Sequence, residues 1–195
     1  MGEKIRILGI APYEAMKTAM LRLAQNRSEL ELDVYVGDLH YGVEIVRHHM
    51  DEYYDAIISR GGTAELIEQV ADVPVVEISL SVYDILRAMK LAENYKERYA
   101  IVGFPSITGS AHVLCDLLRY QIDIFTIHSG DEVLSTMEKI KEEGYRMVVC
   151  DMISHTKAKD LGLNAILITS GVESIESAFD QAVKISRSYM KVYHE

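Results

Sequence analysis

Short apolar runs alternate with longer amphipathic segments along almost the whole chain. The short runs are rich in β-branched residues and are typical of strands, whereas the longer segments place apolar residues three or four positions apart, as helices do. The expected strands are residues 4–10, 32–36, 55–59, 73–78, 99–104, 122–127, 146–150 and 165–169. The expected helices are residues 13–26, 43–50, 64–71, 81–95, 108–119, 130–143, 156–161 and 171–192.

Strands that are separated by helices favour parallel sheets covered on both faces, and the unbroken apolar character of these strands agrees with that arrangement. We therefore predict an α/β fold with two Rossmann-like lobes, each a three-layer α/β/α sandwich, and a ligand cleft between them. Residues 1–80 would form the first lobe, with helix 171–195 packing back on it, and residues 96–170 the second. Residues 81–95 would form a connecting helix. No repeat beyond the alternation of strands and helices is visible.

Several local signals refine the helix boundaries. Ser81 is expected to cap the helix that follows it, and two capping boxes are expected, one at Ser129 and Glu132 and one at Ser170 and Glu173. The last helix has an apolar stripe that either packs on the first lobe or leads to an output domain or a dimer partner. The stripe consists of Ile175, Ala178, Phe179, Ala182, Ile185, Tyr189 and Tyr193.

Composition narrows the possible functions. The 195 residues are 49% hydrophobic and carry a net charge of -10, and no basic cluster is present, which argues against direct binding to nucleic acid or to anionic lipid. No apolar segment approaches the roughly 18 residues of a membrane span, and no secretory signal is visible. Cys115 and Cys150 lie in apolar surroundings and are interpreted as buried free thiols of a reducing compartment. These features predict a cytoplasmic protein.

In open parallel sheets, ligands bind beyond the carboxyl ends of the strands, where helix N-termini offer unpaired N–H groups to anions. The turns at that edge are small and polar here, so we predict that they hold a small anionic metabolite with a carboxylate or phosphate group. The candidate ligand-binding residues are Arg60, Gly61, Gly62, Thr63, Ser79, Ser81, Pro105, Ser106, Thr108, Gly109, Asp151, Ser154, His155, Thr169, Ser170 and Gly171.

The turn Arg60-Gly61-Gly62-Thr63 is the strongest of these candidates. Arg60 would supply a bidentate cation for a carboxylate, the two glycines would let the backbone approach the ligand, and Thr63 would cap the following helix and face the cleft. The alternative is a tight turn with Arg60 in solvent. The turn matches neither the dinucleotide fingerprint nor a Walker A loop, so no nucleotide cofactor is expected.

Metal binding is not expected. His155 follows Asp151 by four residues and could face it across one helical turn, but a third ligand is missing at a useful spacing. His48 and His49 stand beside acidic residues in an exposed helix end, which is a weak signal for a metal site.

Catalytic residues are not expected either. A cofactor-independent racemase needs one thiol from each lobe, whereas Cys115 and Cys150 both fall in the second lobe. The chain has no G-x-S-x-G elbow. Asp151 follows a strand as a phosphoacceptor would, but Pro105 and Ser106 stand where the accompanying acidic pair belongs, so its phosphorylation is not expected.

A series of short motifs gives the chain a family likeness. In order, these are Ile58-Ser59-Arg60-Gly61-Gly62-Thr63-Ala64, Val73-Pro74-Val75-Val76, Ser81-Val82-Tyr83-Asp84-Ile85-Leu86, Ile101-Val102-Gly103-Phe104, Val148-Val149-Cys150-Asp151, Ala158, Gly162-Leu163, Ile168-Thr169-Ser170-Gly171, Glu173-Ser174-Ile175 and Ala178-Phe179. In order and spacing the chain resembles the N-terminal sensor domain of the propionate catabolism activator family. That domain occurs on NtrC-type, sigma-54-dependent transcription regulators, a class associated with phosphorelays.

The resemblance implies a sensor that binds a small organic acid, such as a methylcitrate-like tricarboxylate, and controls an attached ATPase. This chain has no Walker A sequence and no helix-turn-helix, so it is expected to be either a sensor part of a larger regulator or a free-standing relative. Its partner would be the output ATPase domain or a second chain, reached through the C-terminal helix, and a homodimer is possible. The alternatives are a small-molecule enzyme of racemase-like two-lobed architecture and a dimerisation or interaction module.

Overall fold

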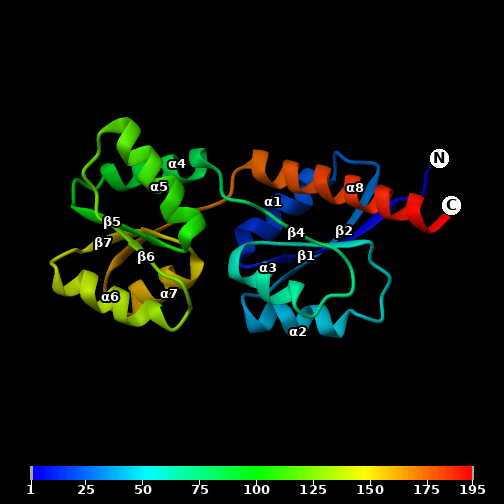
Figure 1. Ribbon diagram of the computed structural model, residues 1–195, viewed down its shortest axis with the longest axis horizontal. Coiled ribbons are helices and arrows are strands. Elements are labelled where there is room, and N and C mark those ends of the chain that lie inside the picture. Colours follow the sequence, from blue (N-terminus) through cyan, green and yellow to red (C-terminus); the bar gives the residue numbers. More distant parts are fainter. Residues whose placement is uncertain (1, 195) are drawn as a thin grey trace. The chain divides into compact units, whose positions relative to one another are not determined.

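The computed structural model describes the backbone of residues 2–194 and the side chains of residues 2–189 (Figure 1). The strands are β1 (Ile5–Ala11), β2 (Leu30–Val36), β3 (Ala56–Ser59), β4 (Val75–Glu77), β5 (Tyr99–Gly103), β6 (Ile124–Thr126), β7 (Met147–Cys150) and β8 (Asn164–Leu167). The helices are α1 (Glu14–Ala24), α2 (His40–His48), α3 (Gly61–Glu68), α4 (Val82–Glu93), α5 (Pro105–Leu118), α6 (Glu132–Glu142), α7 (Met152–Asp160) and α8 (Val172–His194).

The strands form two four-stranded parallel sheets with the orders β2-β1-β3-β4 and β6-β5-β7-β8. The prediction of an α/β fold with two parallel-sheet lobes is confirmed. The chain divides into two compact units, which we call unit 1 (Met1–Ser79 and Val172–Glu195) and unit 2 (Leu80–Gly171). The chain therefore passes from one unit to the other twice.

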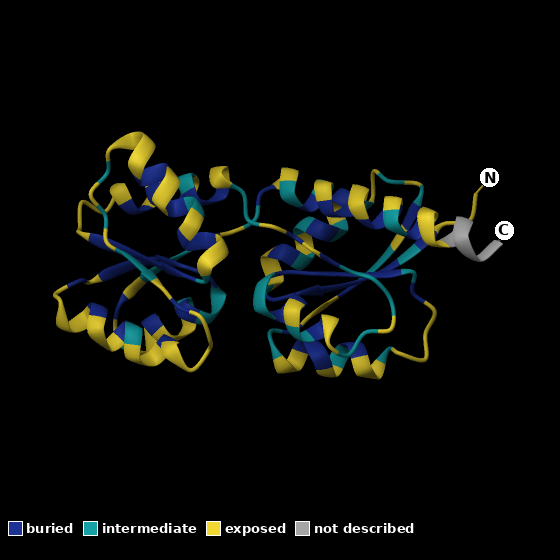
Figure 2. Cartoon of the chain, in the orientation of Figure 1, coloured by how far each residue is buried: buried dark blue, intermediate teal, exposed yellow. Residues whose placement is uncertain are grey.

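Each sheet is covered by helices on both faces, which makes each unit a three-layer α/β/α sandwich (Figure 2). In unit 1, α1 and α8 bury Met20 and Phe179 on one face, while α2 and α3 bury Val46 and Ile67 on the other. In unit 2, α4 and α5 cover one face, and α6 and α7 cover the other. Burial on both faces is the reason that β3, β5 and β7, which are buried at every residue, read as unbroken apolar runs.

Two helices lie at the points where the chain changes unit. Residues 81–95 were expected to connect the lobes, but α4 packs within unit 2 against α5, β7 and β8, where Met89 is fully buried. α8 packs within unit 1 against α1, β1, β3 and β4, and its stripe residues Ile175 and Phe179 lie in the core. Tyr189, further along that stripe, is exposed, and the side chain of Tyr193 lies outside the described residues.

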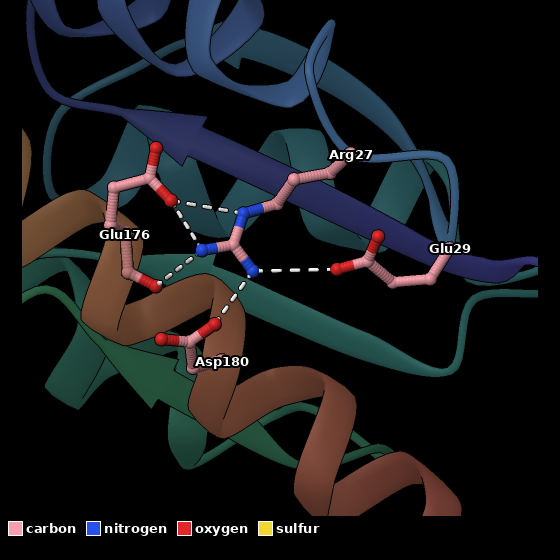
Figure 3. Close-up of polar contacts among 4 residues, drawn as sticks. All are labelled: Arg27, Glu29, Glu176 and Asp180. Carbon is pink, nitrogen blue, oxygen red and sulfur yellow. Dashed lines mark hydrogen bonds and ion pairs between the residues drawn. The ribbon is translucent and has the colours of Figure 1, made fainter.

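Arg27, in the loop between α1 and β2, attaches α8 to unit 1 through a cluster of polar contacts (Figure 3). Its guanidinium donates hydrogen bonds to both the side chain and the backbone carbonyl of Glu176. It also donates to Asp180 at 2.7 Å and to Glu29 at 3.4 Å. Its carbon Cζ lies 5.5 Å from the ring centre of Phe179. The charge cluster and the buried ring thus hold α8 at the same point.

Four helices, α2, α3, α5 and α7, begin three or four residues earlier than the sequence predicts, and α5 and α7 show the physical reason. α5 starts at Pro105 rather than at Thr108, because proline suits the first helical turn, where a backbone N–H is not needed. α7 starts at Met152 rather than near Thr156, because the Asp151 side chain accepts the N–H of Ser154 and caps the helix. The segments that were expected to be turns are therefore first turns of helices.

The expected capping box at Ser129 and Glu132 does not form. α6 begins at Glu132 with Asp131 as its N-cap residue. Glu132 reaches back to accept the N–H of His128 at 2.9 Å instead of the N–H of Ser129. A glutamate in the first turn stabilises this helix start, but its partner lies one residue further back than the motif requires.

The expected capping box at Ser170 and Glu173 does not form either. The Ser170 hydroxyl is buried and makes no hydrogen bond to any described residue. The N–H of Gly171, which precedes α8, instead donates to Asp84 of α4 at 2.8 Å. A capping box is present at the start of α4, where Ser81 and Asp84 each accept the backbone N–H of the other. The prediction that Ser81 caps this helix is confirmed.

An arginine, an aspartate and a tyrosine contact one another near the amino ends of the strands in unit 1. Arg6, in β1, lies 3.5 Å from the carboxylate of Asp33 in β2. The hydroxyl of Tyr54, just before β3, lies 2.9 Å from the same carboxylate and 2.8 Å from that of Glu52. The Arg6 guanidinium carbon lies 4.9 Å from the centre of the Tyr54 ring.

The same three residue types occur at the corresponding place in unit 2. Arg98, just before β5, lies 3.7 Å from the carboxylate of Asp123, and its guanidinium carbon lies 3.9 Å from the ring centre of Tyr145. The Tyr145 hydroxyl donates a hydrogen bond to Asp123. Tyr54 and Tyr145 stand two residues before Ala56 and Met147, which pair with Ile7 and Tyr99, the residues after the two arginines. The units therefore share an internal repeat that the sequence did not reveal.

Candidate functional site

Arg60 stands between β3 and α3 and is the N-cap residue of that helix. Its side chain is only 6% exposed, so the alternative of an arginine in solvent is wrong. The guanidinium donates to the hydroxyl of Tyr13 at 2.9 Å, and its carbon Cζ lies 5.8 Å from the ring centre. Tyr13 follows β1, the neighbouring strand. A buried cation is thus held at the carboxyl end of the sheet, beside the positive end of a helix.

The two glycines of this turn open α3. Gly61 has a φ of +56°, which glycine adopts without strain, and a side chain at this position would meet no atom within 4 Å. Its N–H hydrogen bonds to the carboxylate of Glu77, at the end of β4. Burial and the nearby Glu65 raise the pKa of Glu77, while the Gly61 N–H and Arg60 lower it by less. The first turn of α3 therefore already binds a carboxylate from unit 1 itself, that of Glu77.

Thr63 has a different role from the predicted one. It lies in the first turn of α3, inside the helix and 1% exposed, and it does not cap the helix. Its hydroxyl donates to Asp38 at 2.9 Å and accepts the N–H of Leu39 at 2.9 Å. Leu39 has a φ of 48°, which is unfavourable for a leucine, and this bond fixes it at the start of α2. Thr63 joins two turns of the same edge.

The candidate residues nearest to the unit boundaries differ in their surroundings. Ser79, at the end of unit 1, is exposed. Ser81 is the N-cap residue of α4, and its N–H donates to Asp84 at 2.9 Å. Gly171, at the end of unit 2, donates to the other oxygen of the same carboxylate. Thr169 is exposed. Asp84, which sequence reasoning used only as part of a motif, joins two of the candidate turns.

The first turn of α5 supplies four further candidates. Pro105 and Ser106 are its first residues, and Ser106 is exposed. Thr108 is 2% exposed, and its hydroxyl accepts a hydrogen bond from Thr126 of β6 at 2.8 Å. Gly109 is exposed within the helix and would accept a side chain without a close contact. The N–H groups of this turn and the exposed surface at Ser106 and Gly109 can meet a ligand, whereas Thr108 serves the packing of α5.

The first turn of α7 combines an acidic cap with a buried hydroxyl. Asp151 is 9% exposed and accepts the N–H of Ser154 at 2.9 Å. The Ser154 hydroxyl is buried and has no hydrogen-bond partner among the described residues. Burial and Lys159 lower the pKa of His155, and a hydrogen bond with the Ala165 backbone raises it by less. His155 bonds to Asp151 through its backbone N–H at 2.9 Å.

Within each unit the structure therefore brings most of the candidates to one edge of a sheet. Sequence reasoning missed Tyr13, Asp38, Glu77 and Asp84. Tyr13 and Asp38 each lie two residues beyond the end of a strand of unit 1, and Glu77 is the last residue of β4, so the rule that selected Arg60 also applied to them. That the candidate turns of the two units serve one ligand stays a prediction.

Burial raises the pKa of both Cys115 and Cys150, so neither thiol is activated as a nucleophile. No group of three His, Cys, Asp or Glu side chains among the described residues is placed to hold a metal ion. In the part of the chain that the structure describes, no helix is both long and apolar enough to span a bilayer.

Residues 26–191 match the model of a protein family described as propionate catabolism activator. The crystal structure of an NtrC family transcriptional regulator from Clostridium acetobutylicum is 26% identical with a TM-score of 0.84. That match covers 96% of this chain and 100% of the other.

More distant structures share the fold alone. The transcription regulator CcpA of Lactococcus lactis is 11% identical with a TM-score of 0.52, and the match covers 95% of this chain and 92% of that chain. A LacI family transcriptional regulator from Mycobacterium smegmatis is 13% identical with a TM-score of 0.52, over 92% of this chain and 90% of that chain.

Proposed function

The chain belongs to the propionate catabolism activator family, and from this premise we propose that it senses a small organic acid for an NtrC-type, sigma-54-dependent regulator. The observation that carries the proposal is Arg60, a buried guanidinium at the N-terminus of α3 and at the carboxyl end of its sheet. A buried cation beside the partial positive charge of a helix favours a carboxylate ligand.

The proposed ligand is a methylcitrate-like hydroxy acid with several carboxylates. One carboxylate binds Arg60 and the N–H group of Gly62 at the start of α3. Glu77 lies beside this turn and accepts a hydrogen bond from the hydroxyl group or from a protonated carboxyl group of the ligand. The acidic side chain of Glu77 thereby favours a hydroxy acid over a bare polyanion such as phosphate.

The proposed role is regulatory. Buried thiols with raised pKa values supply no nucleophile, and a sensor needs only a difference in ligand affinity between two states. The proposed site of action is the cytoplasm. An output ATPase domain or a second copy of the chain would be reached through α8. A surface hollow of about 350 Å³ lies along this helix, lined by Asp180, Val183, Lys184, Arg187 and Ser188, and no candidate ligand residue lines it.

Thermal unfolding with and without 2-methylcitrate tests the proposal. A ligand at a hundred times its Kd, binding the folded state alone, stabilises that state by about 2.7 kcal/mol. Arg60→Ala is expected to weaken binding by about ten- to a hundredfold, because a hydrogen bond to a charged group contributes about 1.5–3 kcal/mol. Arg22→Ala, which removes an exposed arginine from α1, is the matched control and should bind as the parent does.

Citrate and propionate complete the panel of acids. Citrate should bind and propionate should not, because propionate has neither a hydroxyl group nor a second carboxyl group to meet Glu77. An Arg60→Ala protein whose melting point rises as much as that of the parent would refute the proposed contact. Conversion of the acid, followed by NMR of the ligand during incubation, would refute the regulatory role.

A further inference from the structure

Asp84 is a nearly inaccessible carboxylate, 1% exposed, in the first turn of α4. Its oxygen Oδ2 accepts the N–H of Ser81 at 2.9 Å, and its oxygen Oδ1 accepts the N–H of Gly171 at 2.8 Å. Arg87, one turn further along α4, donates to Oδ1 at 3.1 Å. A buried carboxylate with two backbone donors and a neutralising arginine has one favourable arrangement, because the loss of any partner leaves charge without solvation.

The two backbone donors occupy a special place in the chain. Unit 2 begins at Leu80 and ends at Gly171, so Ser81 and Gly171 are the unit 2 ends of the two segments that cross to unit 1. These ends are 90 positions apart in the sequence and are joined through one side chain. Both belong to the candidate ligand-binding turns. The bonds lie wholly inside unit 2.

We propose that Asp84 is a positioning residue of the sensor, which ties both crossing segments to α4 as one rigid piece. The inference rests on the proposed function, since it assigns Asp84 the task of holding two ligand-binding turns in place. Because these turns are already ordered, binding of the ligand costs less conformational entropy.

Amide exchange of the nitrogen-15-labelled protein, read by NMR, tests directly whether Asp84 holds Ser81 and Gly171. In Asp84→Ala, the amides of Ser81 and Gly171 should exchange at least tenfold faster, because local opening no longer breaks a bond to a carboxylate. In Asp84→Asn, which keeps the size of the side chain, one oxygen remains and one of the two amides should keep its protection. Unchanged exchange at both amides in Asp84→Ala would overturn the inference, whatever the protein binds.

Ligand affinity separates positioning from general stability. Binding of 2-methylcitrate to Asp84→Ala and Asp84→Asn should be about five- to tenfold weaker, from the cost of ordering the released turns. Met89→Ala removes a fully buried side chain from the same helix and leaves the carboxylate in place, so its affinity should change less than twofold. Equal losses in the Asp84 and Met89 variants would reduce Asp84 to a structural role.

The same titration distinguishes this inference from the proposed function. In both Asp84 variants the ligand should still slow amide exchange at residues 60–63, because Arg60 and α3 are untouched. If the ligand does not slow exchange at these residues in the parent, the proposed function fails. The role of Asp84 in holding Ser81 and Gly171 is then still tested by the exchange rates of those two amides. If the ligand binds the Asp84 variants as tightly as the parent, the positioning role is overturned while the proposed function stands.

Discussion

Unit 1 and unit 2 repeat each other at the amino ends of their strands and differ at the carboxyl ends. The strand orders correspond, and the cluster of Arg6, Asp33 and Tyr54 has its counterpart in unit 2. At the opposite edge, β3 and β7 end at Ser59 and Cys150, so Arg60 corresponds to Asp151. The same N-cap position thus carries a cation in one unit and an anion in the other.

The hydroxyl residues of these two turns differ as well. Thr63 of unit 1 is held by Asp38 and by the N–H of Leu39, whereas the corresponding Ser154 hydroxyl is buried with no partner in the described part of the chain. The contacts at the amino ends, which occur in both units, pair an arginine and a tyrosine hydroxyl with a carboxylate and are interpreted as structural. The contacts that differ lie where ligands bind in parallel sheets. The difference indicates that the carboxyl edges, and not the amino edges, are specialised.

The largest expected effect is that of truncating the side chain that anchors α8. Phe179→Ala removes a fully buried ring from unit 1 and should lower the free energy of unfolding by about 3–5 kcal/mol. Amide exchange should accelerate first in β1 and β3, and less in β5 and β7, if the two units keep separate cores. Leu117→Ala, at a residue 75% exposed on α5, is the control and should change stability by less than about 0.5 kcal/mol. Equal acceleration in both sheets would show that the two cores unfold together.

A smaller effect tests the repeat itself. Tyr54→Phe and Tyr145→Phe each remove one hydroxyl that bonds to a carboxylate, Asp33 or Asp123. Each should cost about 1 kcal/mol, a typical contribution of one partly exposed hydrogen bond, and leave 2-methylcitrate affinity unchanged. Urea unfolding of both variants measures the two costs side by side. A loss of ligand affinity in either variant would contradict the assignment of the amino edges to structure.

The smallest expected effect is that of replacing Glu77, the carboxylate that lies at the N-terminus of α3. Because the pKa of Glu77 is raised in the folded protein, its ionised form opposes folding. Below the ordinary value of 4.5 both states are protonated, so Glu77→Gln should match the parent there and gain stability as the pH rises above it. Melting curves between pH 4 and pH 7 measure this gap. The same variant should bind 2-methylcitrate less than threefold differently, and a gap that closes with rising pH would have the wrong sign.

Much of the fold was predictable because hydrophobic periodicity is a local property. Both ends of each strand were predicted to within two residues, since runs such as Ile57-Ile58 and Val148-Val149 have no plausible helical face of their own. Pro105 and Asp151 were recognised as belonging to turns, but their action as helix-starting residues was not. Capping depends on which backbone N–H lies within reach, and Glu132 and Ser170 show that spacing alone does not decide it.

The sequence by itself determined the alternation of strands and helices, the parallel sheets and the polar turns at their carboxyl ends. The tertiary structure decided that α4 joins unit 2, that Arg60 donates to Tyr13, and that Asp84 accepts the N–H of Gly171. These contacts join residues far apart in the chain and several involve backbone N–H groups, which have the same chemistry at every position. Only the folded geometry decides which backbone N–H group a buried charged side chain will bond to.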